Sequence, residues 1–275
     1  MKPPFVQIAR DIPGAEGPCF DLEGRFFMVC PGRGQILQVD LDSGSAREHA
    51  NTGGVPAGLA CDRENRLWVA DMKLGILRVS PEGRIEDVVR TFEGQPIRGC
   101  NDLAFDGRGT VYFSAPAGSS AEKPVGEAYC RRADGTVLRI DAGYAFSNGV
   151  AVRADDSELI VAETRPKALW AFGLAPDGSI GPKHRFATLP GKHRGGPDGM
   201  DFDVEGNLLA ANWGGGTIDI FAPNGVLIER LEAPFDKPSN VHFGGADRCD
   251  LYVTEHTTNG LWRTRWRYPG QPVIR

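Results

Sequence analysis

The stretch "GLACDRENRLWVADMKLGILRVS", residues 58–80, holds the pattern that decides the fold. A short apolar segment runs into the polar turn "DREN", and a second apolar segment, "RLWVADM", follows that turn. A third, "LGILRVS", follows after Lys73. Short apolar runs separated by turns rich in Asp, Asn and Gly are typical of antiparallel β-hairpins.

The second strand of this hairpin occurs six times along the chain. The copies are "RFFMVCP" from Arg25, "RLWVADM" from Arg66, "TVYFSAP" from Thr110, "ELIVAET" from Glu158, "NLLAANW" from Asn207 and "DLYVTEH" from Asp250. Their starts are 41, 44, 48, 49 and 43 residues apart. Four short strands in each repeat of this length indicate a β-propeller.

We therefore predict an all-β fold, a six-bladed β-propeller with four-stranded blades around a central metal-binding tunnel. One domain is expected to span residues 1–275, with "FVQIA" near the start closing the ring. Two independent β-sandwiches are the alternative, but a single repeat phase through the whole chain disfavours them.

The composition limits the partners. With a net charge of −5 and no basic run, the chain is not expected to bind nucleic acid. No apolar stretch approaches the roughly 20 residues of a membrane helix, and the amino terminus lacks the apolar region of a signal peptide. We therefore expect a cytoplasmic protein, and a monomer because closed blades leave no free sheet edges. Six scattered cysteines without a CxxC pair predict reduced, mostly buried thiols.

One position in each repeat, five residues before the turn, should start the innermost strand of its blade. We call this set the ring: Glu16, Ala57, Asn101, Asn148, Asp198 and Asn240. The residues that close the second strands should stand beside it, and we call them the collar: Pro31, Met72, Pro116, Thr164, Trp213 and His256. Oxygen ligands that converge without thiolates suit a hard cation, above all Ca²⁺. Local turn formation by Asn and Asp is the alternative, although it does not explain Glu16.

Specific strings sharpen this reading. The chain resembles the SMP-30/gluconolactonase superfamily, which includes regucalcin, and within it the calcium-dependent phosphotriesterases of the diisopropylfluorophosphatase (DFPase) type. The resembling strings include "DIPGAEGPCFD", "GCNDLAFD", "NGVAVR", "DGMDFD", "LLAANWGGGTIDIF", "KPSNVHF" and "VTEHTTNGLW". The segments after "MVCPG" and at 118–130 are shorter than in the phosphotriesterase. Both are expected at the end of the tunnel where the substrate would enter, so they concern substrate selectivity and not the metal site.

The resemblance implies two Ca²⁺ ions and a substrate pocket. Residues Glu16, Asn101, Asn148 and Asp198 would hold a catalytic ion. A structural ion in the tunnel would be held by Asp201, His242 and the carbonyl of Val241. The pocket would be lined by Met72, Phe146, Thr164, Trp213 and Ser239. At its floor, His256 would act in proton transfer or simply pack and hydrogen-bond, while Asp102 would orient ligands.

For function, the resemblance implies a Ca²⁺-dependent hydrolase. The ion would polarise a phosphoryl oxygen while Asp198 acts as nucleophile or as general base, cleaving the P–F bond or a related bond of an organophosphorus triester. A sugar or aliphatic lactonase at the same site is the rival enzyme, and a natural lactone substrate is compatible with phosphotriesterase activity. A propeller scaffold or calcium buffer is the non-enzyme alternative, but neither needs an oxygen-rich tunnel mouth.

Overall fold

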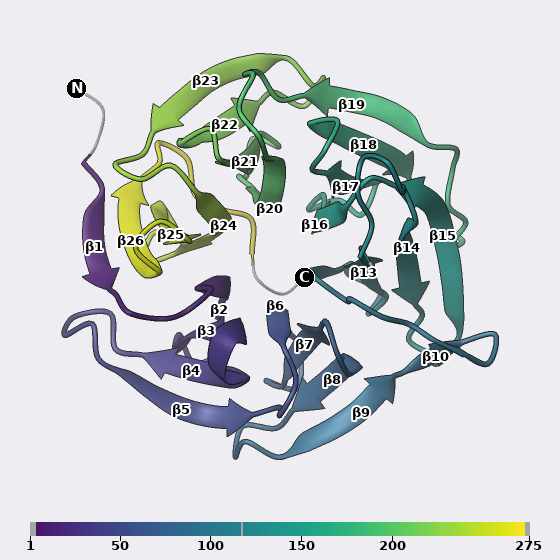
Figure 1. Cartoon of the computed structure of the whole chain (residues 1–275), viewed down its shortest axis with the longest axis horizontal. Helices are drawn as coiled ribbons and strands as arrows, with labels where there is room; N and C mark the ends of the chain where they lie inside the picture. Colours follow the sequence, from purple (N-terminus) through teal and green to yellow (C-terminus); the bar gives the residue numbers. More distant parts are fainter. Residues whose placement is uncertain (1–3, 117, 273–275) are drawn as a thin grey trace.

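A computed structural model describes residues 4–116 and 118–272. Six four-stranded antiparallel sheets stand around a central opening, as Figure 1 shows. The all-β, six-bladed propeller expected from the repeats is confirmed.

Five blades are formed by consecutive strands. They are β2 (Glu16–Phe20), β3 (Phe26–Cys30), β4 (Gln35–Val39) and β5 (Ala46–Asn51); β6 (Pro56–Cys61), β7 (Leu67–Asp71), β8 (Gly75–Val79) and β9 (Ile85–Val89); β12 (Leu103–Phe105), β13 (Val111–Ala115), β14 (Gly126–Arg131) and β15 (Val137–Tyr144); β16 (Ser147–Val152), β17 (Glu158–Glu163), β18 (Ala168–Gly173) and β19 (His184–Thr188); and β20 (Gly196–Phe202), β21 (Leu208–Trp213), β22 (Thr217–Phe221) and β23 (Leu227–Glu232). Between the second and third blades lies a small hairpin, β10 (Thr91–Phe92) and β11 (Gln95–Pro96), and a 3₁₀ turn, η1, spans Pro31–Arg33.

The sixth blade joins the two ends of the chain. It contains β24 (Pro238–Gly244), β25 (Asp250–Glu255) and β26 (Gly260–Arg265), and its outer strand is β1 (Val6–Ala9). Strand β1 pairs antiparallel with β26, with Gln7 opposite Trp262. The prediction that the amino-terminal segment closes the ring is therefore confirmed.

In the polar turns between first and second strands, an aspartate side chain accepts two backbone N–H groups of its own turn. The Oδ1 atom of Asp62 accepts the backbone N–H groups of Glu64 and Arg66, both at 2.9 Å. Asp21, Asp106 and Asp203 make the same pair of bonds in their own blades. An aspartate that satisfies the turn's own N–H groups explains why the repeated turns begin with Asp.

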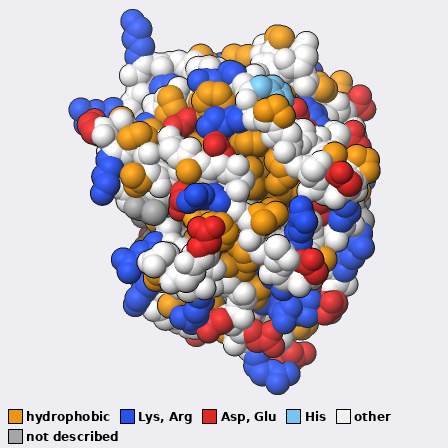
Figure 2. All heavy atoms as spheres, turned by 90° about the vertical axis from the view of Figure 1, so that its right-hand side faces the viewer, with side chains coloured by type: hydrophobic (Ala, Val, Ile, Leu, Met, Phe, Trp, Pro, Cys, Tyr) orange, Lys and Arg blue, Asp and Glu red, His pale blue; other side chains and the backbone are white. Residues whose placement is uncertain are grey.

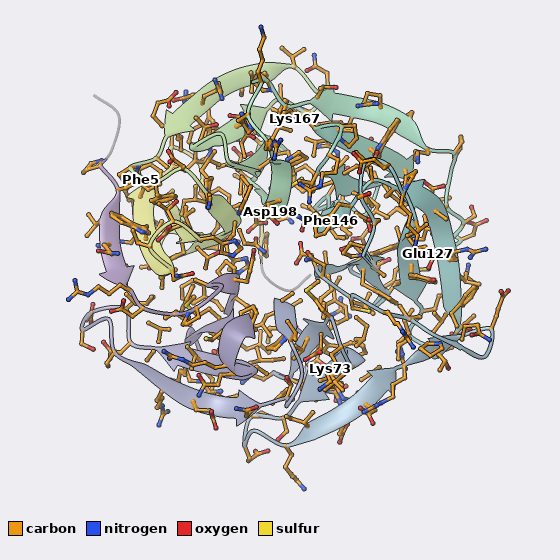
Figure 3. All side chains as sticks on the ribbon, in the orientation of Figure 1. Phe5, Lys73, Glu127, Phe146, Lys167 and Asp198 are labelled. Atoms are coloured by element: carbon orange, nitrogen blue, oxygen red, sulfur yellow. The ribbon has the colours of Figure 1, made fainter. Side chains whose placement is uncertain are left out.

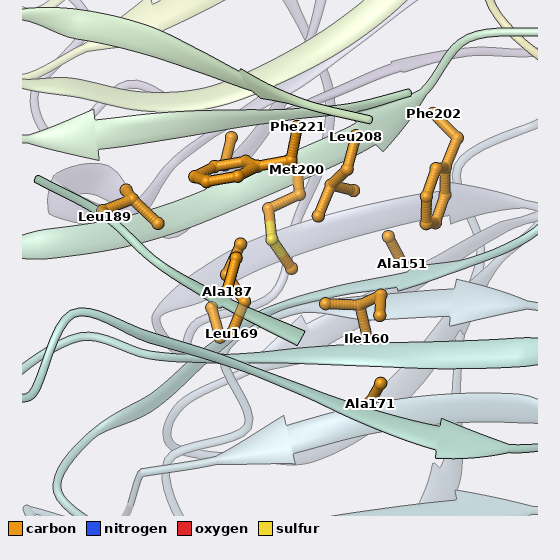
Figure 4. Packing of buried hydrophobic residues seen from close by; sticks show 12 residues of the cluster. Ala151, Ile160, Leu169, Ala171, Ala187, Leu189, Met200, Phe202, Leu208 and Phe221 are labelled. Atoms are coloured by element: carbon orange, nitrogen blue, oxygen red, sulfur yellow. The ribbon is translucent and has the colours of Figure 1, made fainter. Parts of the chain in front are cut away.

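The core is divided into six hydrophobic clusters among the described residues, one between each pair of neighbouring blades. Figure 4 shows the cluster between the blades of β16–β19 and β20–β23, where Met200 and Phe221 pack among Ile160, Leu169 and Leu208. Figure 2 looks at the outer side of the ring, where hydrophobic side chains lie between scattered charged ones. Packing between blades fixes each inner strand against its neighbours and so sets the geometry at the centre.

All six cysteines are buried and free, as expected. None of the helices in the described part of the chain has the length and hydrophobicity needed to span a membrane.

Candidate functional site: the mouth of the central tunnel

The ring positions lie where the first strands of the blades begin. Glu16 is the first residue of β2, Asn148 the second of β16 and Asp198 the third of β20. Asn101 precedes β12 by two residues, and its backbone N–H donates to the carbonyl of Ser114 at 3.0 Å. The innermost strands therefore carry these residues to one end of the central opening, beside which Figure 3 labels Asp198 and Phe146.

Glycines that follow ring residues let neighbouring blades approach closely. A Cβ atom on Gly149 would lie 2.0 Å from the carbonyl oxygen of Asp198, and one on Gly199 would lie 1.9 Å from Cγ of Asn240. Non-bonded atoms do not approach so closely, so only glycine fits at either position. The "NG" and "DG" pairs of the sequence are thus explained by close packing around the tunnel.

Three buried carboxylates repel one another at this end. Burial, together with the charges of Asp198 and Asp102, holds the pKa of Glu16 well above its ordinary value. Burial and the charge of Asp102 raise the pKa of Asp198 in the same way. Burial raises the pKa of Asp102 to about 6. A bound cation would relieve both the repulsion and the lost hydration of these groups.

An amide oxygen next to these carboxylates also lacks a partner. Asn148 is only 4% exposed, and its Nδ2 donates to Oγ1 of Thr164 at 3.1 Å. Its Oδ1 is buried and accepts no hydrogen bond from residues 4–116 or 118–272. Because the adjacent carboxylates have no proton to donate when ionised, a cation is the natural partner for this oxygen.

Carboxylates just outside the ring provide a contrast, because they are fully used in holding loops. Asp71 accepts N–H groups from Val55 and Leu74, both at 3.0 Å. Glu163 accepts the N–H of Ala145 at 2.6 Å and the indole N–H of Trp170 at 2.7 Å. The underused carboxylates are thus those of the ring and not of its surroundings. In the described part of the chain, His, Cys, Asp and Glu residues alone form no three-membered metal cluster, so a site here depends on Asn oxygens.

His256 stands beside Glu16 with its protonation state defined by geometry. The indole Nε1–H of Trp213 donates to Nδ1 of His256 at 3.1 Å. A neutral imidazole must then carry its proton on Nε2, which lies 3.5 Å from Oε1 of Glu16. Burial lowers the pKa of His256 and so favours this neutral form. His256 therefore faces Glu16 with its Nε2–H, which makes no hydrogen bond to any described residue, and is not placed as a base at Nε2.

Two predicted pocket residues adjoin the ring. Thr164 is buried, and its hydroxyl donates to the carbonyl of Pro197 at 2.9 Å while it accepts from Asn148. Phe146 has a positive φ of 77°. Its N–H donates to Oγ of Ser119 at 2.9 Å, and its carbonyl accepts the N–H of Thr164 at 3.0 Å. These bonds hold Phe146 in the left-handed conformation beside the opening.

Two more predicted pocket residues, Met72 and Ser239, lie in different surroundings. Met72 lines a hollow of about 750 Å³ with Lys73 and the exposed Arg98. Ser239 is fully buried, and its hydroxyl donates to the carbonyl of Ala15 at 2.8 Å. Met72 is thus open to a ligand, whereas the hydroxyl of Ser239 is used to join the last blade to the first.

The residues implied for a second ion meet deeper in the tunnel. Asp201, Val241 and His242 line a partly open cavity of about 100 Å³, together with Asp102. Nδ1 of His242 lies 3.2 Å from Oδ2 of Asp201, which leaves Nε2 as the free acceptor of a neutral ring. Nε2 is buried without a hydrogen-bond partner in the described chain. A carboxylate that orients a histidine in this way is common at metal sites.

Family models match residues 14–257 to the SMP-30/gluconolactonase/LRE-like region. The chain belongs to the SMP-30/gluconolactonase family. It is 41% identical to the diisopropyl-fluorophosphatase of Loligo vulgaris, over 98% of this chain and 95% of the relative. It is 28% identical to pentonolactonase XacC of Haloferax volcanii, over 87% and 80% of the two chains. The solved structure of a calcium-binding protein, regucalcin, from Agrobacterium tumefaciens superposes with a TM-score of 0.82 at 21% identity, covering 100% of this chain and 96% of that one. At that identity the likeness shows the fold alone.

Within this SMP-30/gluconolactonase chain, sequence reasoning missed two features of the site. It gave no role to Arg98, although the structure places this residue in one hollow with Met72. It also gave no role to the carboxyl-terminal residues Gln271 and Pro272, which line the inner cavity. No repeat pattern marks either feature, because each lies outside the strands that repeat.

Proposed function

We propose that the protein is a calcium-dependent hydrolase of the diisopropylfluorophosphatase type, acting on P–F and related bonds of organophosphorus triesters. The observation that carries the proposal is the combination of mutually repelling carboxylates with an unpartnered amide oxygen at the tunnel mouth. The 41% identity to a diisopropyl-fluorophosphatase supports the reaction class.

Four ring residues would hold the catalytic ion: Glu16, Asn101, Asn148 and Asp198. Bound there, Ca²⁺ would act as a Lewis acid on a phosphoryl or carbonyl oxygen. Asp198 would act in one of two ways. It would attack the substrate itself as a nucleophile, or it would take a proton from the water that attacks. Burial and the charge of Asp102 raise the pKa of Asp198, and a bound cation would favour the ionised form that both roles need.

The remaining residues position the substrate and the ligands. The Nε2–H of His256 would hold the carboxylate of Glu16 in place. Phe146 and Trp213 would present apolar surface beside the ion, which suits alkyl ester groups better than a polyhydroxylated sugar. Asp102 would act from below the ring through its charge and through its bond to the N–H of Val150 at 2.9 Å.

A lactonase is the second candidate, and Arg98 is the observation that favours it. This exposed guanidinium shares the hollow of Met72, where it would hold a hydroxyl or carboxylate of a sugar-derived lactone. Pentonolactonase XacC of Haloferax volcanii belongs to the wider set of relatives.

Initial rates on both substrate classes test the proposal. Wild type should release fluoride from diisopropyl fluorophosphate faster than it opens any member of a small lactone panel, and Asp198→Asn should abolish both activities. Arg98→Ala should leave fluoride release unchanged. Lactone turnover without fluoride release, lost in Arg98→Ala, would replace the phosphotriesterase by the lactonase.

A further inference from the structure

The carboxyl-terminal residues Gln271 and Pro272 reach the inner strands of the propeller. Gln271 and Pro272 line the 100 Å³ cavity together with Asp201 and His242. A space of this size has room for several water molecules.

Backbone bonds anchor this segment to the blade of β20–β23 and to the last blade. Gly270 forms a β-bridge with Asp203, and its N–H donates to the carbonyl of Arg248 at 2.8 Å. The N–H of Gln271 donates to the carbonyl of Phe202 at 3.0 Å. Gly270 also packs so closely on Phe243 that an added Cβ would lie 2.1 Å from Cβ of that residue. The position of Gln271 is therefore set by the surrounding fold.

The side chain of Gln271 has its amide orientation defined. Its Nε2 donates to the carbonyl of Val152 at 3.1 Å. The carbonyl oxygen Oε1 must then be the other end of the amide, and it is buried with no hydrogen-bond partner in residues 4–116 and 118–272. Two unpartnered atoms thus border one small cavity: Oε1 of Gln271 and Nε2 of His242.

We infer that Gln271 gives its amide oxygen to the hydration shell of a cation held by Asp201, Val241 and His242. An oxygen acceptor, a histidine nitrogen and a carboxylate around a few waters form a mixed shell that accepts Ca²⁺. Because Gln271 would add a contact to that shell, the inner ion leaves more slowly than the ion at the mouth. This inference rests on the calcium part of the proposed function and is independent of the substrate.

Calcium release from the loaded protein, followed by stopped-flow mixing with a fluorescent chelator, tests the inference. Wild type should release Ca²⁺ in two phases, and Asn148→Ala should accelerate only the faster one. Gln271→Ala should accelerate the slower phase by about tenfold, the size of effect usual for residues that support metal ligands. Gln271→Glu, which keeps an oxygen, should retain slow release. Gln95→Ala, at an exposed glutamine of β11, is the matched control.

An unchanged slow phase in Gln271→Ala would overturn the inference, as would equally fast release from Gln271→Glu, since packing alone would then explain the effect. Two release phases without any hydrolase activity would refute the proposed reaction but leave the role of Gln271 standing. A protein that binds no Ca²⁺ would refute both.

Discussion

Replacement of Ser239 by alanine separates a structural role from a substrate-binding role. The hydroxyl of this fully buried serine donates to the carbonyl of Ala15 at 2.8 Å and exchanges a hydrogen bond with Thr254 at 2.9 Å. Ala15 is also fully buried, so Ser239→Ala leaves its carbonyl without this donor. An unsatisfied buried acceptor costs about 1–3 kcal/mol of the free energy of unfolding.

Urea denaturation of the calcium-loaded protein measures this loss. In a chain of roughly this size, each kcal/mol lowers Tm by about 2–4 °C, so calorimetry should give a matching decrease. Because Ala15 precedes Glu16, we also expect weaker calcium binding at the mouth, with an unchanged KM for any substrate at saturating calcium. Ser179→Ala, at an exposed serine, should change the free energy of unfolding by less than about 0.5 kcal/mol.

The opposite result would refute this reasoning. If Ser239→Ala keeps the wild-type free energy of unfolding but raises KM, the hydroxyl faces the substrate, and the resemblance describes Ser239 better than the structure does.

Four further predictions follow from the ring and from His256. Asn148→Ala should weaken calcium binding at the mouth at least about tenfold, measured by calorimetric titration, and an unchanged affinity would remove this residue from the ligand set. Calcium should bind more tightly at pH 7.5 than at pH 5, with proton release, because the raised pKa values of Glu16, Asp198 and Asp102 leave them protonated in acid. The stability of the calcium-free protein should change in the opposite direction and fall as the pH rises. The pKa of Asp102 rises from 3.8 to about 6, so that above pH 3.8 the unfolded state ionises first and about 3 kcal/mol of stability is lost by pH 7; pH-independent denaturation of the stripped protein would contradict this. His256→Gln should lower kcat by less than about tenfold and leave the pH profile unchanged, since a general base would contribute about 10²–10⁴-fold, and a larger loss with a missing inflection would make His256 a base.

The fold was predictable because repetition multiplies a weak signal. A single hairpin such as that around "DREN" has many possible contexts, but six copies in one phase leave few. The closing strand at Val6–Ala9 was also within reach, since a ring of blades must join its ends. The contacts of Gly270 and Gln271 could not be predicted, because they involve isolated backbone groups and no strand pattern.

The sequence grouped the residues of the candidate site, but it did not predict which of their polar atoms already have hydrogen-bond partners. Glu16, Asn148 and Asp198 occupy equivalent positions in their repeats, so periodicity alone grouped them. Periodicity does not say which polar atoms are already satisfied, and that property separates Asn148, with its bare Oδ1, from Ser239, whose hydroxyl is used. The tautomer of His256 likewise depends on Trp213, which lies in another blade and is 43 residues away in the sequence.

Fluoride release from diisopropyl fluorophosphate, followed with an ion-selective electrode on one preparation before chelation, after chelation and after calcium is restored, tests the central claim most directly. The account predicts turnover that disappears with the metal, returns with it, and is absent throughout in Asp198→Asn. Turnover that survives complete removal of calcium, or that persists in Asp198→Asn, would contradict it.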